Sequence, residues 1–201
     1  MREADKLNDK EMREVLFDYY ESTNERLRIF EELCIAKSRA DAILVRENCL
    51  IGFEIKSDRD SLERLESQVK NYSKFCNLCY IVTGNKHIDK ITEYVPETYG
   101  IIKIFYDENK KLSLEIVREA TRKPKEALKR KLKHQLSLLW RPEIVSIAKA
   151  NKVKPISGKS KPKIATMLVE QVPFDILQGA ICEALMERDY SIYLEKEDAE
   201  A

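Results

Sequence analysis

Three charged residues in one stretch of the chain could together hydrolyse a phosphodiester bond. Asp41 opens the apolar run 42–45, and Glu54 and Lys56 end the apolar run that begins at Cys49. Side chains at positions i and i+2 of a strand lie on one face about 7 Å apart, so Glu54 and Lys56 should point the same way. A short connection between the two strands would place Asp41 opposite them. Two carboxylates and one ammonium group would then converge on one place.

A divalent cation would neutralise such a cluster, because charges at the edge of an apolar layer cost free energy of desolvation unless a partner offsets them. Carboxylate oxygens suit Mg²⁺, for which Mn²⁺ can substitute, and Mg²⁺ often takes one or two carboxylates plus phosphate oxygens. We expect Asp41 and Glu54 to be the metal ligands. Lys56 would orient the attacking water or offset charge in the transition state.

The alternative interpretation is a charge cluster at the end of a strand with a simple Glu–Lys ion pair. The triplet Glu-x-Lys is not specific in a chain that is 35% charged, and it occurs again at Glu108 and Lys110. That second copy lies in a polar turn, whereas the first ends an apolar strand and follows an aspartate on the strand before it.

The hydrophobic pattern places this cluster in an α/β domain, with a mixed sheet flanked by helices, followed by a basic all-helical C-terminal region. Strand signals stop after Arg118, which predicts one unit over 1–118 and a second over 119–201. The expected elements are a helix over 8–21, strands over 27–36, 39–45 and 49–56, a helix over 60–75, a strand over 78–83, a short helix over 87–94, strands over 100–106 and 112–117, and helices over 124–138, 142–150, 161–170 and 174–189.

Charge is distributed unevenly along the chain. The whole sequence has 36 Lys and Arg against 35 Asp and Glu, a formal net charge of +1, but residues 119–170 have 14 basic against 4 acidic residues, or +10, which leaves −9 elsewhere. A basic block of this size favours a nucleic-acid partner, and a solvated helical surface is the alternative. The side chains expected to contact nucleic acid are Lys129, Arg130, Lys133, Lys154, Lys159, Lys161 and Lys163.

Several classes of protein are not expected. No apolar run is long enough for a signal peptide or a membrane span, so we expect a cytoplasmic protein with no membrane partner. An odd number of cysteines, five, indicates reduced thiols. Cys76 and Cys79 form a CxxC, but no second pair follows at zinc-ligand spacing, and His87 and His134 are the only histidines. His-dependent nucleophilic catalysis is therefore not expected.

Asp41, thirteen residues before Glu54-Ile55-Lys56 and with a helix on either side of the strands, resembles the PD-(D/E)XK nuclease superfamily, which includes restriction enzymes and Holliday-junction resolvases. Where that superfamily has a proline before the aspartate, this chain has Ala40. The resemblance implies a restriction-endonuclease-like sheet and metal-dependent cleavage of nucleic acid.

A second element of that resemblance lies on the following helix. Gln68 and Tyr72 match the QxxxY pattern of the branch similar to the exonuclease domains of bacterial recombination helicase-nucleases. Residues four apart share one helix face, so the pair could contact DNA or support the active site. The alternative is a glutamine at the rim beside a tyrosine in the core.

A longer pattern is similar to a family of short nuclease-like proteins carried by bacteria and phages, over about residues 30–105. It comprises Arg39-Ala40-Asp41, Gly52-Phe53-Glu54-Ile55-Lys56-Ser57-Asp58, Leu65 and Gln68. In that pattern Glu32 also tends to be acidic, which implies an auxiliary ligand for the metal or for water. Some superfamily members use a glutamate from the first helix, and Glu14 and Glu21 are both candidates here. The cysteines do not have the distribution of relatives that hold an iron–sulfur cluster, so none is expected.

The basic segment has a resemblance of its own. Residues 140–167 look like a SAP-type helix–loop–helix module, in which lysines around the loop contact phosphates of DNA. A generic helical cap on the sheet is the alternative. In either case the basic block would give salt-dependent affinity that does not depend on sequence.

Two hypotheses follow. The first is a Mg²⁺-dependent nuclease that acts on DNA, as an endonuclease or an exonuclease, in repair, a phage life cycle or host defence, and as a monomer or a homodimer. The second is a non-catalytic DNA-binding or assembly protein that retains the nuclease fold. The complete Asp, Glu and Lys set, with a matching Gln and Tyr, favours catalysis.

Overall fold

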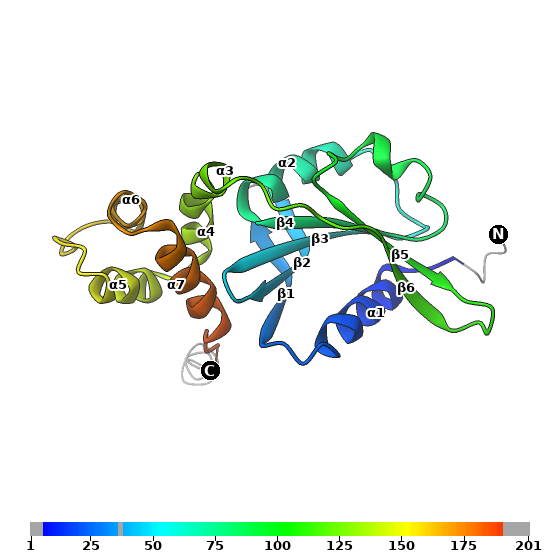
Figure 1. Ribbon diagram of the computed structural model, residues 1–201, viewed down its shortest axis with the longest axis horizontal. Helices are drawn as coiled ribbons and strands as arrows, with labels where there is room; N and C mark the ends of the chain where they lie inside the picture. The colour runs from blue at the N-terminus through cyan, green and yellow to red at the C-terminus, as the bar shows by residue number, and fades with distance from the viewer. Residues whose placement is uncertain (1–5, 36–37, 191–201) are drawn as a thin grey trace, which may run out of the picture.

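One six-stranded mixed sheet forms the centre of the computed structural model, which describes residues 6–35 and 38–190. The strands lie in the order β1-β2-β3-β4-β5-β6, with parallel pairing only of β3 with β4 and of β4 with β5 (Figure 1). Helices flank the sheet, which confirms the predicted α/β class. The strands are β1 (Leu27–Ile35), β2 (Ser38–Arg46), β3 (Cys49–Lys56), β4 (Leu78–Thr83), β5 (Gly100–Tyr106) and β6 (Leu112–Arg118).

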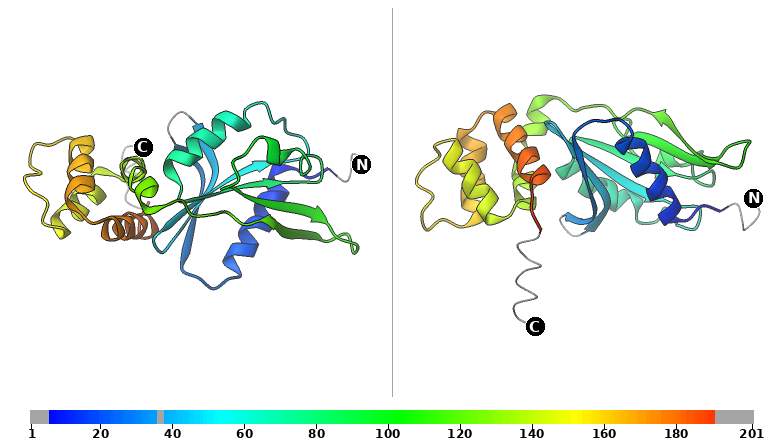
Figure 2. Two further views of the ribbon diagram at one scale, coloured as in Figure 1. Left: turned by 45° about the horizontal axis from the view of Figure 1, so that its top comes forward. Right: turned by 90° about the horizontal axis from the view of Figure 1, so that it is seen from below.

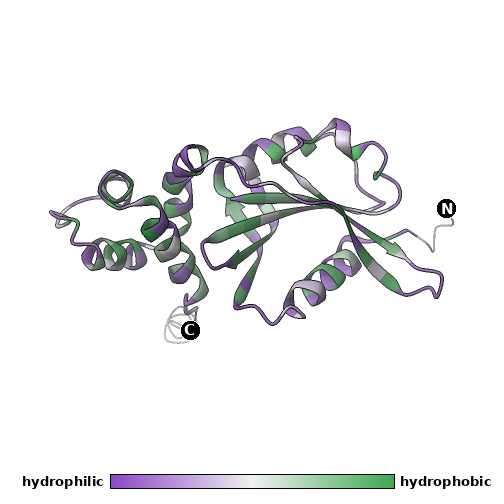
Figure 3. Cartoon of the chain, in the orientation of Figure 1, coloured by the Kyte–Doolittle hydropathy of each residue, from purple (hydrophilic) through white to green (hydrophobic). Residues whose placement is uncertain are grey.

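The first helix, α1 (Asp9–Glu21), covers one face of the sheet (Figure 2). It begins with a capping box, in which the Asn8 side chain accepts the N–H of Glu11 and the Glu11 carboxylate accepts the N–H of Asn8. Met12 and Leu16 of α1 pack into one hydrophobic cluster with Phe53 and Ile55 of β3. The strands and the inward faces of the helices are accordingly the most hydrophobic parts of the chain (Figure 3).

The second helix, α2 (Leu65–Phe75), covers the opposite face and comes very close to β3. Gly52 permits this approach, because a Cβ atom at that position would lie 2.5 Å from Cδ1 of Tyr72 and 2.6 Å from Sγ of Cys76. Any larger residue at Gly52 would push α2 away from the sheet.

The helix α2 begins five residues later than the sequence predicts. The Asp60 carboxylate accepts both the N–H and the hydroxyl of Ser57, at 2.8 and 2.6 Å. The Asp58 carboxylate accepts the N–H groups of Leu7 and Lys86, at 3.1 and 3.0 Å. Such side-chain-to-backbone bonds compete with helix formation, and here they hold residues 57–60 as a turn.

Two further predicted helices are shorter than expected. In place of a helix over 87–94, the structure has turns and the 3₁₀ segment η2 (Ile91–Glu93), since a segment this short seldom forms an α-helix. In place of one helix over 124–138, it has α3 (Lys125–Lys129) and α4 (Leu132–Leu138). The break lies at Lys131, whose buried ammonium group donates a hydrogen bond to the carbonyl of Cys76.

The remaining helices are α5 (Arg141–Ala150), α6 (Lys161–Gln171) and α7 (Phe174–Met186). They gather at one end of the sheet (Figure 1), and α7 contacts β1, β2 and β3. Their buried side chains belong to the same hydrophobic cluster as α2. The boundary predicted at residue 118 coincides with the end of β6. The independence of the two units stays a prediction. Among the described helices, none is long and apolar enough to cross a membrane.

Candidate active site

The sheet register brings the three predicted residues together. Ala42 pairs with Phe53, so Asp41 lies one residue further along β2, beside Glu54. Oδ2 of Asp41 accepts the N–H of Ile55 at 2.7 Å, and Oε1 of Glu54 accepts a hydrogen bond from Nζ of Lys56 at 2.6 Å. Both carboxylates and the ammonium group thus lie where β2 and β3 stop pairing, on the α2 face of the sheet.

The Glu54–Lys56 pair is almost completely buried, with 1% of Glu54 and 5% of Lys56 exposed. Oε2 of Glu54 accepts no hydrogen bond from any residue that the structure describes. Burial, and next the nearby Asp41 carboxylate, raise the pKa of Glu54 to about 7 against the opposing effect of Lys56. Burial also raises the pKa of Asp41, although the N–H of Ile55 and the charge of Lys56 act in the opposite direction. Burial thus disfavours the charged form of both carboxylates, and a bound cation would favour it.

The donor set fits a small divalent cation. Asp41 and Glu54 supply hard carboxylate oxygens, and one buried oxygen of Glu54 lacks a partner within the described ranges, which a cation would provide. No three His, Cys, Asp or Glu side chains of the described residues lie together as a metal-binding group. A metal here would have two protein carboxylates, with water or substrate oxygens as its other ligands.

Glu32 is not brought to this pair. Its neighbours in β1 pair with Ala40 and Ala42, which places its backbone beside Asp41, but its φ is +53°. This left-handed conformation is uncommon for a residue other than glycine. Its Oε2 lies 3.2 Å from Nη1 of Arg39, and 52% of its side chain is exposed. The expected role as an auxiliary ligand is therefore not supported by the position of its carboxylate.

The first helix contributes a cation to the site. Nη1 of Arg13 donates to the carbonyl of Asp41 at 2.9 Å, and Nη2 lies 4.0 Å from Oδ1 of Asp41. Glu14, one of the two candidates on this helix, is exposed and lies 3.9 Å from the ammonium group of Lys10. Glu21 is also exposed, at the last position of the helix. Charge spacing in the sequence gave no sign of Arg13, because only the packing of α1 on the sheet directs it to Asp41.

Tyr72 and Gln68 have different surroundings although they share one helix face. The Tyr72 hydroxyl donates to the carbonyl of Phe53 and accepts the N–H of Asp41, each at 2.8 Å, and the residue is 1% exposed. Gln68 is half-buried, and its Oε1 is a buried atom that has no hydrogen-bond donor among the described residues. Tyr72 thus ties β2 to β3, while Gln68 offers an acceptor to the site.

An open pocket of about 660 Å³ exposes the Asp41 end of the site. We call it the carboxylate pocket. Its lining residues are Arg39, Asp41, Arg64, Ser67, Gln68, Lys70, Asn71 and Lys74. Four of these are cations and one is an acid, so the rim suits a phosphate group. Sequence reasoning missed the four cations as site residues. The available signal was their spacing: Arg39 stands two residues before Asp41 on its strand, Arg64 directly precedes α2, and Lys70 and Lys74 lie on that helix.

The predicted nucleic-acid contacts of the C-terminal region lie outside this pocket. Lys129 on α3, Arg130 directly after it and Lys133 on α4 are all exposed. They lie near the last residue of α2, where the rings of Phe75 and His134 are 5.3 Å apart. Around the α5–α6 loop, Lys154 and Lys163 are exposed, Lys159 is half-buried, and Lys161 donates to the carbonyl of Ser137 at 2.9 Å. Their contact with nucleic acid stays a prediction.

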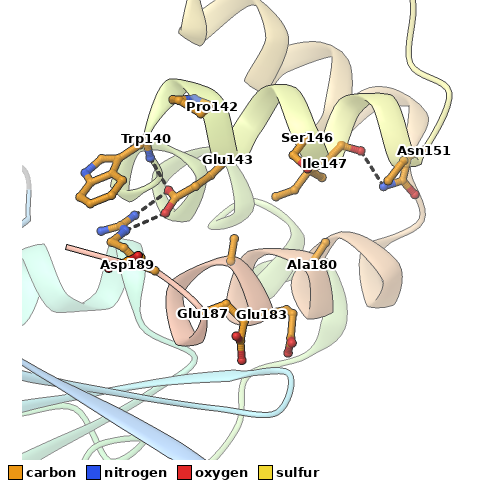
Figure 4. A pocket seen from close by; sticks show the side chains of 13 residues that line it. Trp140, Pro142, Glu143, Ser146, Ile147, Asn151, Ala180, Glu183, Glu187 and Asp189 are labelled. Atoms are coloured by element: carbon orange, nitrogen blue, oxygen red, sulfur yellow. Dashed lines mark hydrogen bonds and ion pairs between the residues drawn. The ribbon is translucent and has the colours of Figure 1, made fainter. Parts of the chain in front are cut away.

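Another face of the helical region is acidic. A hollow of about 540 Å³ lies between α5 and α7, where Figure 4 shows Trp140 and Ile147 above and the carboxylates of Glu183 and Glu187 below. Both carboxylates form ion pairs with Arg26. The guanidinium of Arg188 lies 4.4 Å from the Trp140 ring. This rim does not favour phosphate groups, so any basic surface of the region lies elsewhere.

The comparison with protein families decides where the chain belongs. The model of the family described as bacteriophage P4 protein cII matches residues 2–199. The chain belongs to this family. Protein cII of Enterobacteria phage P4 is 27% identical over 119 residues, which are 58% of this chain and 45% of that protein. The chain thus spans about half the length of this protein cII relative.

Among solved structures, Pyrococcus furiosus SfsA in complex with Ca²⁺ is similar to 56% of this chain. The match covers 63% of the SfsA chain, with 12% sequence identity and a TM-score of 0.36. Neither its bound ion nor its activity is carried over to this member of the protein cII family.

Removal of the Tyr72 hydroxyl should destabilise the protein. In Tyr72→Phe the N–H of Asp41 and the carbonyl of Phe53 lose their shared partner, which should lower the free energy of unfolding by about 1–3 kcal/mol. Urea denaturation followed by circular dichroism measures this change. Tyr106→Phe, at a tyrosine that is 38% exposed, is the control and should stay within about 0.5 kcal/mol of the wild type. Equal stability of Tyr72→Phe and the wild type would show that the hydroxyl does not hold the strands.

The raised pKa of Glu54 predicts a pH dependence of stability in chelator. Between pH 4.5 and pH 7 the folded protein keeps a proton on Glu54 that the unfolded chain releases, so the free energy of unfolding should fall as the pH rises. The fall attributable to Glu54 is about 3 kcal/mol. Urea titrations of the wild type and Glu54→Gln across this range measure it as the difference between the two curves. Parallel curves would contradict the burial of an unsatisfied carboxylate.

Proposed function

We propose that the chain is a Mg²⁺-dependent phosphodiesterase of nucleic acid, a nuclease of the PD-(D/E)XK type, and that DNA is its substrate. The observation that carries this proposal is the buried Glu54, which is paired with Lys56 and left with one unsatisfied oxygen. It lies beside Asp41, which lines a cationic pocket. The order of elements agrees with the resemblance noted in the sequence. One helix precedes three antiparallel strands and another follows them, and the acidic residues lie on the second and third strands.

The residues of the chain have distinct parts in this proposal. Asp41 and Glu54 would hold the cation, which supplies polarisation of the phosphate and a lowered pKa of the attacking water. The ammonium group of Lys56, 2.6 Å from Glu54, would orient that water or offset negative charge in the transition state. The cations at the pocket rim would hold the phosphates on either side of the bond that is cleaved. Tyr72 is a positioning residue, since its hydroxyl forms hydrogen bonds with the backbone of Asp41 and Phe53.

The cleavage experiment is direct. The purified protein is incubated with supercoiled, linear, single-stranded and branched DNA in Mg²⁺, in Mn²⁺ and in chelator. We expect cleavage of at least one substrate with metal and none in chelator. Lys56→Ala should reduce the rate on the order of 100-fold or more, because a charge aimed at the transition state is lost. Asp41→Asn and Glu54→Gln should reduce it at least as strongly.

A matched control exists in the second Glu-x-Lys triplet of the chain. Glu108→Gln and Lys110→Ala change the same residue types in the exposed turn between β5 and β6, and cleavage should remain at the wild-type rate. Absence of cleavage with every substrate, or cleavage undiminished by Lys56→Ala, would reject the proposed activity. Metal-independent DNA binding that survives Asp41→Asn and Glu54→Gln would then support a non-catalytic binding or assembly protein.

The salt dependence of binding can locate the surface that holds the DNA backbone. In chelator, the slope of log K against log salt concentration should become less negative by about 0.9 for each phosphate contact removed from duplex DNA. We compare Lys70→Ala/Lys74→Ala at the pocket with Lys129→Ala/Lys133→Ala on α3 and α4. Lys111→Ala, an exposed lysine of the β5–β6 turn, is the control. An unchanged slope in both double variants would contradict backbone contact at either surface.

A further inference from the structure

A second hollow lies beside the carboxylate pocket, and α2 contributes residues to both. This hollow of about 630 Å³ is bounded by α2 and by the segment after η2. We call it the Tyr94 hollow. Its lining residues are Glu66, Val69, Lys70, Ser73, Lys74, Glu93, Tyr94, Val95 and Pro96. Val69 and Val95 are each only 7% exposed, whereas Tyr94 is 42% exposed. The hollow therefore presents an accessible aromatic ring together with apolar side chains.

The two depressions differ in charge. The carboxylate pocket has four cations and one carboxylate, while in the Tyr94 hollow two lysines are balanced by Glu66 and Glu93. A phosphate group would be attracted to the first and would gain little in the second. An uncharged, flat and largely apolar group suits the Tyr94 hollow, because it can pack on the exposed ring and requires no neutralising charge.

Lys70 and Lys74 line both depressions. Lys70 forms an ion pair with Glu66 at 2.6 Å, but both side chains are about 70% exposed, and exposed ion pairs contribute little stability. Lys70 can therefore leave Glu66 and pair with a phosphate group with little loss of free energy. A strand whose phosphates contact these two lysines would have its bases within reach of Tyr94.

We propose that the Tyr94 hollow is a stacking site for an unpaired nucleobase of the strand that enters the carboxylate pocket. The substrate class that follows is single-stranded nucleic acid, or a duplex opened at a junction or an end, because the base faces of an intact duplex are covered by their neighbours. This inference rests on the proposed function for the identity of the strand. Stacking on an aromatic side chain and contact of lysines with the backbone are the general means by which proteins hold single strands.

Binding in chelator tests the inference independently of cleavage. Oligonucleotides that carry one 2-aminopurine are titrated with the wild type, Tyr94→Ala and Tyr94→Phe, and both affinity and 2-aminopurine fluorescence are measured. We expect Tyr94→Ala to weaken single-strand binding roughly 5- to 150-fold and to abolish the fluorescence change. Tyr94→Phe, which keeps the aromatic ring, should retain both. Tyr106→Ala, which removes an exposed tyrosine from the end of β5, should also retain both.

The outcomes separate the two proposals. Unchanged single-strand affinity in Tyr94→Ala, or an equal loss of affinity for intact duplex, would overturn the stacking site whether or not the protein cleaves DNA. An affinity loss in Tyr94→Phe as large as in Tyr94→Ala would also overturn it, since the ring would then not be the binding group. A Tyr94-dependent fluorescence change without metal-dependent cleavage of any substrate would support the stacking site and reject the nuclease activity.

Discussion

The arrangement of the site depends on the two hydrogen bonds of the Tyr72 hydroxyl group. This hydroxyl lies where β2 and β3 stop pairing, and it replaces the missing ladder bonds by accepting from Asp41 and donating to Phe53. The ring reaches this position because Gly52 has no side chain. The same contact fixes α2 against the sheet, and so it determines where Gln68 and the lysines of that helix stand relative to the carboxylates.

The C-terminal end of α2 is held by hydrogen bonds from the helical region. The carbonyls of Phe75 and Cys76 accept hydrogen bonds from the Gln135 amide and the Lys131 ammonium group. These carbonyls are among those that a helix end leaves without internal partners, so the C-terminal helices satisfy groups that α2 cannot. Burial lowers the pKa of Lys131, because a charged ammonium group at this junction loses hydration free energy. One helix thus joins the carboxylates to the helical region.

Alternation along β3 was enough to predict that Glu54 and Lys56 share one face, because a strand has a period of two and the apolar residues Phe53 and Ile55 then face the other way. It did not show which face α2 covers. The strands and the fold class followed from the same pattern. The late start of α2 could not be predicted, since it depends on the bonds of Asp58 to Leu7 and Lys86, which are distant in sequence. The cationic rim was missed for a related reason: spacing shows that residues share a face of a helix, but not which strand that face meets.

The length of α2 sets how many nucleotides of a bound strand could lie alongside it. Its eleven residues span about 16 Å at 1.5 Å per residue, and the carboxylate pocket is lined from Arg64, just before the helix, to Lys74 in its last turn. Tyr72 and the carbonyls of Phe75 and Cys76 anchor the last two turns of the helix, which cannot move along the sheet without breaking buried hydrogen bonds. At about 3.4 Å per nucleotide, the length of the helix corresponds to roughly five nucleotides of a strand that runs along α2. A strand held by the cations of the carboxylate pocket would then have about that many nucleotides alongside the helix that carries two of them.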